Sequence, residues 1–274
     1  KLLNHFLSQI ASKYLASMHA SSIIYEEKNG KFTEKELKML EENAYPKEPH
    51  RTRAIGFGRG VKILSQLIKL IPKYKNSLKL EEIQEKFIKV CQQLLTFVEP
   101  SKKYKNVLSH GDLWSNNIMF KYDKNKKPCG VKLIDYQLAR YSAPSMDLAT
   151  FIYVCSTKEV RRLHHNAILN SYCDVLESEL QLNQIDTNIL PRDEIFKSFE
   201  EYRVAGLIEA ALFCHLILLP NELAANIMQS SEEYEKFISQ CRAEKCFKAF
   251  EEEYYRERMT ELLTELVDEY VLKE

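Results

Sequence analysis

Three polar side chains with a meaningful spacing lie between residues 112 and 135. The stretch 107–120 reads VLSHGDLWSNNIMF, in which Asp112 precedes Asn117 by five positions between two apolar runs. Asp135 follows the apolar run VKLI directly, 23 positions after Asp112. A loop Asp, an Asn five positions later and an Asp at a strand end are typical of enzymes that transfer a phosphoryl group from ATP.

Each residue type suits one part of that chemistry. A carboxylate at Asp112 can accept the proton of an acceptor hydroxyl. Mg²⁺ prefers hard oxygen ligands, so the amide oxygen of Asn117 and the carboxylate of Asp135 are the predicted metal ligands, through which ATP would bind. His110 is interpreted as a residue that hydrogen-bonds the backbone and shapes the loop. The alternative is a polar hairpin that is rich in Asn and Asp but has no catalytic role.

The elements that must position these residues are a small β region set among helices. The short runs VLS, IMF and VKLI predict strands between residues 106 and 135, and KYDKNKKPCG predicts the turn before the last strand. Apolar residues at spacings of three and four predict helices over 1–26, 60–99, 146–182, 191–218, 221–227 and 231–271. The stripe expected to face the core in the first helix is Leu3, Phe6, Leu7, Ile10, Tyr14, Leu15 and Met18. The predicted fold class is therefore mainly α with a small β-hairpin region.

Composition excludes several classes of partner. Lys+Arg and Asp+Glu both number 39 in the 274 residues, so nothing favours nucleic acid or an anionic membrane. The seven scattered Cys residues form no C-x-x-C pair, which favours free buried thiols in a reducing compartment such as the cytoplasm. The longest apolar window, residues 205–219, contains Glu209 and His215 and is too short for a membrane span. It predicts a buried core helix.

The segment HGDLWSNNIMF, followed by VKLIDYQLARYSAPSMDLATFIY, resembles the ecdysteroid kinase-like family, a branch of the choline and aminoglycoside kinase group with a protein-kinase-like fold. The resemblance implies ATP- and Mg²⁺-dependent phosphorylation of a small-molecule hydroxyl, on an ecdysteroid-like steroid or a related alcohol. It implies Asp112 as the catalytic base, and Asn117 and Asp135 as the metal- and cofactor-binding residues. It also implies that Asp147, in PSMDLA, supports the catalytic loop. In LASMHASS, similar to a family helix, His19 is expected to be a buried, hydrogen-bonded core residue.

The resemblance covers nearly all of 1–274 but only the second lobe of the family. We therefore expect one catalytic lobe, with 106–147 carrying the catalytic loop and the metal-binding segment. The N-terminal β lobe is expected to be absent, as in a fragment of a longer kinase. GFGRG at 56–60 does not have the spacing of a nucleotide loop and predicts a loop followed by a helix start.

Two other functions stay open at this point. The chain can be an inactive, pseudokinase-like binding protein that kept the lobe. It can also be a choline or ethanolamine kinase, in which aromatic faces and carboxylates hold a quaternary ammonium group. The residues considered for that role are Tyr153, Tyr202, Phe213 and Glu209, although aromatic residues at helical spacing are more often part of a core.

Overall fold

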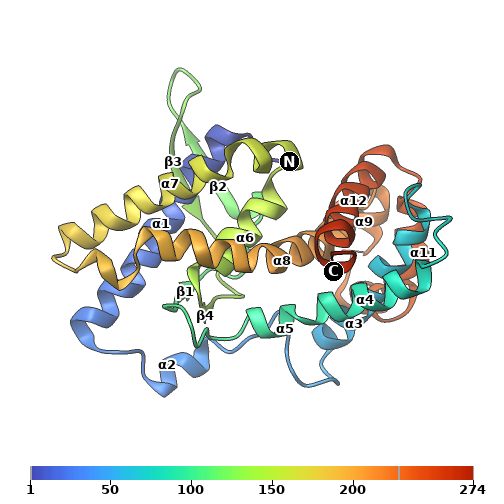
Figure 1. Ribbon diagram of the computed structural model, residues 1–274, viewed down its shortest axis with the longest axis horizontal. Coiled ribbons are helices and arrows are strands. Elements are labelled where there is room, and N and C mark those ends of the chain that lie inside the picture. The colour runs from blue at the N-terminus through green and yellow to red at the C-terminus, as the bar shows by residue number, and fades with distance from the viewer. Residues whose placement is uncertain (1, 228, 274) are drawn as a thin grey trace. The chain divides into compact units, whose positions relative to one another are not determined.

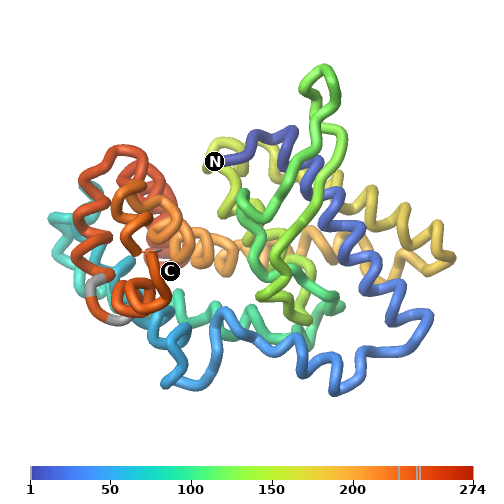
Figure 2. The backbone as a smooth tube through the Cα atoms, turned by 180° about the vertical axis from the view of Figure 1, so that it is seen from behind, coloured from blue at the N-terminus to red at the C-terminus, as the bar shows by residue number. Residues whose placement is uncertain are grey.

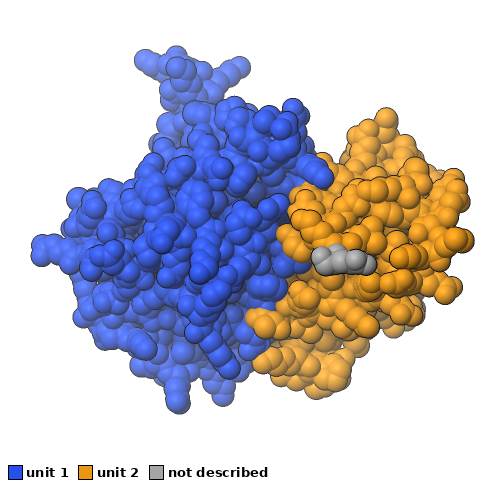
Figure 3. Space-filling model, in the orientation of Figure 1, with its two compact units in different colours: residues 1–42, 97–206 blue, residues 43–96, 207–274 orange. Residues whose placement is uncertain are grey.

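The computed structural model describes residues 2–227 and 229–273, apart from the side chains of residues 239 and 241. The chain forms two compact units, coloured separately in Figure 3. Unit 1 comprises Lys1–Glu42 and Phe97–Gly206, and unit 2 comprises Asn43–Thr96 and Leu207–Glu274. All the strands of the described residues lie between residues 107 and 142, which confirms the predicted fold class, mainly α with a small β region.

The helices of unit 1 surround its strands, and two of them, α1 and α7, lie side by side (Figures 1 and 2). They are α1 (His5–Asn29), α2 (Glu34–Met39), α6 (Pro144–Cys155), α7 (Lys158–Leu182), the 3-10 turn η3 (Thr187–Ile189) and the first part of α8 (Arg192–Ile217). The helix predicted over 146–182 is broken between α6 and α7. Thr157 caps the new helix there, since its hydroxyl accepts from the Val160 N–H at 3.3 Å.

The buried face of α1 differs from the predicted stripe. Leu3 and Leu15 are buried as expected, but Phe6 is 50% exposed and Tyr14 is 41% exposed. The buried residues of α1 are mostly small or polar: Ser8, Ala11, Ser12, Leu15, Ala16, His19, Ala20, Ser22, Ile23 and Glu26. Small side chains let α1 approach α7 closely, because interaxial distance follows side-chain size at the contact. The Ser12 hydroxyl even reaches a main-chain carbonyl of α7, that of Ile168, at 3.2 Å.

The strands form two antiparallel pairs. In one pair, β1 (Val107–Ser109) joins β4 (Arg140–Ser142), with Ser109 opposite Arg140. In the other, β2 (Ile118–Tyr122) joins β3 (Pro128–Leu133) in a hairpin whose tip extends away from the helices of unit 1 (Figure 2). The hairpin was predicted, but β4 was not, because three residues carry too short a pattern to separate a strand from a loop.

Helix α6 is buried along its whole length, and a glycine of α8 packs directly against it. A Cβ atom built on Gly206 would lie 2.5 Å from the carbonyl carbon of Ala149 and 2.6 Å from its oxygen. Real Cβ atoms do not approach backbone this closely, so the two helices meet at this point only because residue 206 has no side chain.

Unit 2 is made entirely of helices in the described residues. They are α3 (Thr52–Leu67), η1 (Ile68–Leu70), α4 (Leu80–Gln92), α5 (Leu94–Phe97, ending in unit 1), the last part of α8, α9 (Asn221–Ile227), α10 (Ser231–Lys236), the π-helical η4 (Phe237–Cys241), α11 (Arg242–Ala249), α12 (Glu253–Leu266) and the π-helical η5 (Val267–Val271). The end of the first predicted helix of this region just before Pro72 is confirmed.

The GFGRG segment is not a loop followed by a helix start, as predicted, but lies wholly inside α3. Its first and last glycines make room for the buried guanidinium of Arg242, which donates to the Gly56 carbonyl at 2.7 Å. A Cβ atom on Gly60 would lie 2.8 Å from Arg242 Nη2. The Arg242 Nε also donates to Nε2 of the buried His215 at 3.0 Å, and burial together with the Arg242 charge holds the pKa of His215 well below its usual range. The glycines therefore serve packing in unit 2.

The cysteines are free wherever their side chains are described. Cys91, Cys155, Cys173, Cys214 and Cys246 are buried, as predicted, whereas Cys129 is exposed. The side chain of the seventh cysteine, at position 241, lies outside the described residues.

The predicted core helix within 205–219 belongs to α8, and most of its residues are buried. In the described part of the chain, no single helix is both long and apolar enough to cross a membrane. One pair bent by 90°, Thr187–Ile217 with Asn221–Ile227, meets the criteria of length and composition alone.

Replacing Gly206 by Ala should destabilise the protein by about 1–3 kcal/mol, because the new methyl group must push α6 and α8 apart. The matched control is Gly58→Ala, also inside a helix, where a Cβ atom meets nothing within 4 Å. That variant should gain about 0.5–1 kcal/mol from helix propensity. Urea unfolding followed by circular dichroism measures both, and equal stabilities for the two variants would contradict the packing argument.

Candidate active site

The candidate catalytic loop leaves β1 through a turn that only glycine can make. Gly111 has φ of +78°, a left-handed conformation, and a Cβ atom there would lie 1.9 Å from the carbonyl oxygen of Leu138. The backbone that follows β3 therefore passes directly against the loop. Glycine permits this contact and brings Asp112, the next residue, to the edge of the strand pair.

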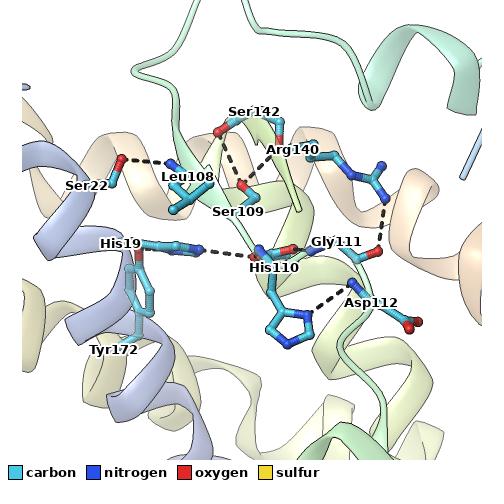
Figure 4. A network of polar contacts seen from close by, with 11 residues as sticks. His19, Ser22, Leu108, Ser109, His110, Gly111, Asp112, Arg140, Ser142 and Tyr172 are labelled. Atoms are coloured by element: carbon cyan, nitrogen blue, oxygen red, sulfur yellow. Dashed lines mark hydrogen bonds and ion pairs between the residues drawn. The ribbon is translucent and has the colours of Figure 1, made fainter. Parts of the chain in front are cut away.

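The backbone on both sides of this turn binds one buried carboxylate, that of Asp147 in the first turn of α6. The N–H of His110 donates to Asp147 Oδ2 at 2.5 Å, and the N–H of Gly111 donates to Oδ1 at 3.0 Å. His19 of α1 donates from Nε2 to the same Oδ2 at 3.2 Å (Figure 4). The N-terminal end of α6 also favours a negative charge at this position. Asp147 thus binds the backbone of the loop on both sides of the turn, and its supporting role stays a prediction.

These contacts keep Asp147 ionised. Burial alone would raise its pKa, but the hydrogen bond and charge of His19 and the N–H of Gly111 outweigh burial, so the pKa lies below the ordinary value of 3.8. Behind His19, the buried Tyr172 hydroxyl lies 2.8 Å from Nδ1. Burial raises the pKa of Tyr172 well above its usual value, so the phenol keeps its proton and its hydroxyl hydrogen-bonds the ring. The prediction that His19 is a buried, hydrogen-bonded core residue is confirmed.

His110 joins the catalytic loop to the segment after β3. Its Nε2 lies 2.9 Å from the carbonyl oxygen of Ile134, which can only accept, so Nε2 carries the proton. Nδ1 then accepts from the N–H of Asp112 at 3.3 Å. The Tyr136 ring packs at 4.6 Å between centroids against the His110 ring. His110 thus hydrogen-bonds the backbone of both segments, and its shaping role stays a prediction.

Asp112 and Asn117 meet in a small buried cluster at the other side of the loop. The 3-10 turn η2 (Ser115–Asn117) carries Asn117 back towards Asp112, so that Nδ2 donates to Asp112 O at 2.9 Å and to Asp112 Oδ2 at 3.0 Å. Both residues are 6% exposed. In Figure 4 the Asp112 carboxylate points away from His19. Because Nδ2 is bound to Asp112, the amide oxygen is the Asn117 atom that can ligate a cation.

The hairpin places the second predicted metal ligand beside the first. Ile118 pairs with Leu133, and the next residues continue the ladder because the Ile134 N–H donates to Asn117 O at 3.0 Å. Asp135 follows immediately, with an exposed side chain and φ of +65°. A left-handed conformation at a residue other than glycine costs about 1–3 kcal/mol and is concentrated at functional sites.

The donors at this position fit magnesium better than a transition metal. Within the described residues, no group of three or more His, Cys, Asp or Glu side chains is placed to hold a metal. Mg²⁺ is commonly held by one or two side-chain oxygens, with phosphate oxygens and water completing its shell. The oxygens of Asn117 and Asp135 have this character, so these are the residues that would hold the ion.

Four residues of the contacts around the loop were missed by sequence reasoning: Ser22, Glu42, Arg140 and Tyr172. The Ser22 hydroxyl accepts from the Leu108 N–H at 2.7 Å, which ties β1 to α1. Arg140 Nη2 donates to the Gly111 carbonyl at 3.0 Å, and its Nη1 lies 3.0 Å from Glu42 Oε2. Only Arg140 had a usable signal, a charged residue four positions before a buried helix. The others come from distant segments and carry no local pattern.

The residues considered for an ammonium-binding cage lie in both units. In unit 1, Tyr153 is 3% exposed and binds Arg203 Nε through its hydroxyl at 2.9 Å. Tyr202 is 5% exposed and packs edge-on against Phe97, with 5.0 Å between ring centroids. These two tyrosines are core residues, as the more conservative interpretation predicted. In unit 2, Glu209 is buried and Phe213 is partly exposed.

Replacing Asp147 by Asn should cost about 3–5 kcal/mol at pH 7, because it removes the charged partner of a buried network. The native pKa of Asp147 is depressed, so its contribution is complete above the ordinary value of 3.8 and is lost as pH falls through the native pKa. The stability difference between wild type and D147N should therefore shrink below about pH 4. Urea unfolding between pH 7 and pH 3 tests this, and a difference independent of pH would contradict it.

The chain is similar to small-molecule kinases among solved structures, at low identity. Among solved structures, the chain is similar to an ethanolamine kinase from Plasmodium vivax (TM-score 0.38, 15% identity, covering 93% of this chain and 62% of that chain). It is also similar to a choline kinase from Cryptosporidium parvum (TM-score 0.43, 14% identity, covering 99% and 70%). TM-scores this low establish neither a shared fold nor a shared activity, and the chain spans less than two thirds of the ethanolamine kinase.

No curated protein sequence matches the chain. The model of the ecdysteroid kinase-like family matches residues 1–185, which is more than half of the 274 residues and includes α1, the catalytic loop, the hairpin, α6 and α7. The resemblance read from the HGDLWSNN and VKLIDYQ segments is thereby confirmed, and the chain belongs to the ecdysteroid kinase-like family.

Proposed function

We propose that this chain carries the catalytic site of an ATP- and Mg²⁺-dependent kinase that phosphorylates a hydroxyl group of a small molecule. One observation carries the proposal. Asn117 hydrogen-bonds the Asp112 carboxylate through its amide nitrogen and the Ile134 N–H through its main chain, so the proposed base and both proposed metal ligands gather at one end of the hairpin. Family membership supports the same reaction class.

In the proposed reaction, Asp112 accepts the proton of the acceptor hydroxyl. The oxygen of that hydroxyl bonds to the γ-phosphorus, and the bond between the γ-phosphorus and the oxygen of the leaving ADP breaks. The amide of Asn117 orients the carboxylate that receives the proton. His110 and Asp147 hydrogen-bond the backbone of the loop and hold it in the conformation that aims Asp112. Positioning of this kind supplies much of the catalysis in phosphoryl transfer, because the protein has little covalent chemistry to perform.

Magnesium, when bound by Asn117 and Asp135, would supply positive charge to the nucleotide phosphates. Asp135 is suited to this because its carboxylate is exposed, where it accepts a 3.2 Å hydrogen bond from Gln137 Nε2. The left-handed backbone of Asp135 aims that carboxylate, and the β2–β3 ladder sets its distance from the loop.

The acceptor that we propose is an ecdysteroid-like steroid or a related alcohol. Family membership supports this class of substrate. The choline or ethanolamine alternative has less support, because Tyr153 and Tyr202 are packed in the core and do not offer open aromatic faces to an ammonium group.

The compartment that we propose is the cytoplasm. The described cysteines are free, and free thiols persist in a reducing environment. The proposed reaction also needs ATP as the phosphoryl donor, and this requirement fits the same compartment.

The Asp112→Asn variant tests the proposed base. Removing the carboxylate that accepts the proton should lower kcat by about 10²–10⁴-fold, while the Kd for Mg²⁺-ATP stays within about twofold, because Asp112 is not a proposed metal ligand. ADP release by the full-length protein with a panel of steroid alcohols gives kcat, and titration calorimetry gives Kd. Wild-type protein that releases no ADP with any acceptor would favour an inactive binding protein instead.

The Asp135→Ala variant tests the proposed metal site. It should abolish the dependence of ATP affinity on Mg²⁺, because the carboxylate that holds the ion is gone. A thermal-shift titration of the full-length protein with ATP, with and without Mg²⁺, measures this, and Asp123→Ala in the hairpin turn is the matched control. Unchanged Mg²⁺-dependent binding in the Asp135 variant would refute the assignment.

A further inference from the structure

We infer that Arg140, neutralised by Glu42, is a positioning residue that sets the direction of Asp112 through the carbonyl group of Gly111. The inference rests on the proposed function, which makes Asp112 the base, and adds two residues to it. Nothing in the loop motif itself identifies either residue, because Glu42 precedes the loop by nearly seventy positions and Arg140 lies on β4.

Arg140 lies on β4, next to the point where the loop begins. In the β1–β4 ladder it stands opposite Ser109, the last residue before the loop. Its guanidinium therefore reaches over the turn, where Nη2 donates to Gly111 O at 3.0 Å (Figure 4). A Cβ atom on Gly111 would lie 3.1 Å from Arg140 Nε, so the missing side chain of Gly111 also provides the space for this contact.

The N–H and the carbonyl of Gly111 are bound by side chains of opposite charge. Its N–H donates to the Asp147 carboxylate at 3.0 Å, and its carbonyl accepts from Arg140. A glycine in the left-handed region has little conformational preference of its own, so external contacts must fix it. The carbonyl of Gly111 belongs to the peptide unit that leads into Asp112. Rotation of that unit would turn the proposed base away from its acceptor.

Glu42 balances the charge of the buried Arg140. Arg140 is only 2% exposed, and a buried guanidinium without a counter-charge is strongly unfavourable. Glu42 Oε2 lies 3.0 Å from Nη1, and its side chain is 15% exposed. The fork of an arginine can serve a carbonyl and a carboxylate at once, whereas a lysine offers one point of charge. The arrangement therefore specifies arginine at this position.

The test uses the full-length protein with Arg140→Lys, Arg140→Ala and Glu42→Gln. We expect kcat to fall about tenfold in R140K and about 100-fold in R140A, with KM for ATP and acceptor within about twofold, because the loop is misaligned while substrates still bind. E42Q should lie between wild type and R140K. Methylguanidinium should restore part of the R140A rate, since it can occupy the vacated space.

The matched control is Arg258→Lys in unit 2. Arg258 is 6% exposed and paired with Glu261, so its replacement should lower the melting temperature comparably and leave kcat within about twofold. A loss of kcat in R258K equal to that in R140K would overturn the inference, because stability alone would then explain both.

A second measurement separates this inference from the proposed function. Amide hydrogen exchange of the peptide 107–117, without substrates, should increase in R140A relative to peptides of α7, and should not increase in R258K. If wild type shows no kinase turnover, the proposed function fails, but this exchange pattern still supports the role of Arg140 in holding the loop. Exchange at 107–117 that is equal to wild type, or an R140A kcat within twofold of wild type, would overturn that role.

Discussion

The buried carboxylate of Asp147 is the interaction on which the arrangement of the site depends. It accepts hydrogen bonds from two successive backbone N–H groups of the loop and from His19. Backbone N–H groups buried without a partner would destabilise any other loop conformation. The carboxylate therefore selects one conformation, and it joins α6, the loop and α1 in a single network.

The same logic extends to the residues around the loop. Three consecutive N–H groups, those of His110, Gly111 and Asp112, bind side chains, since the third donates to the His110 ring. The ring in turn donates to the carbonyl of Ile134, one residue before Asp135. One hydrogen-bonded imidazole thus connects the loop to the residue that precedes the proposed metal ligand. The two halves of the site are coupled by contacts, although 23 positions separate Asp112 from Asp135.

Close packing of the helices that carry Asp147 and His19 supports this network. Every residue of α6 is buried, and the small residues of α1 and the glycine at position 206 let neighbouring helices approach closely. Close packing limits the motion of the elements that carry Asp147 and His19. The polar network needs that rigidity, because hydrogen bonds of this kind tolerate little displacement. Close packing and the polar network therefore stabilise each other in unit 1.

The sequence by itself determined the fold class, most helix positions, the hairpin and the family, because these depend on local periodicity and on a motif with fixed spacing. It also pointed to Asp112, Asn117 and Asp135, whose proposed roles follow from residue type. Tertiary structure alone decided which face of α1 is buried, that GFGRG packs inside a helix, that β4 exists, and that Arg140 and Glu42 meet at Gly111. Each of these depends on contacts between residues far apart in the chain, and the local sequence pattern does not predict such contacts.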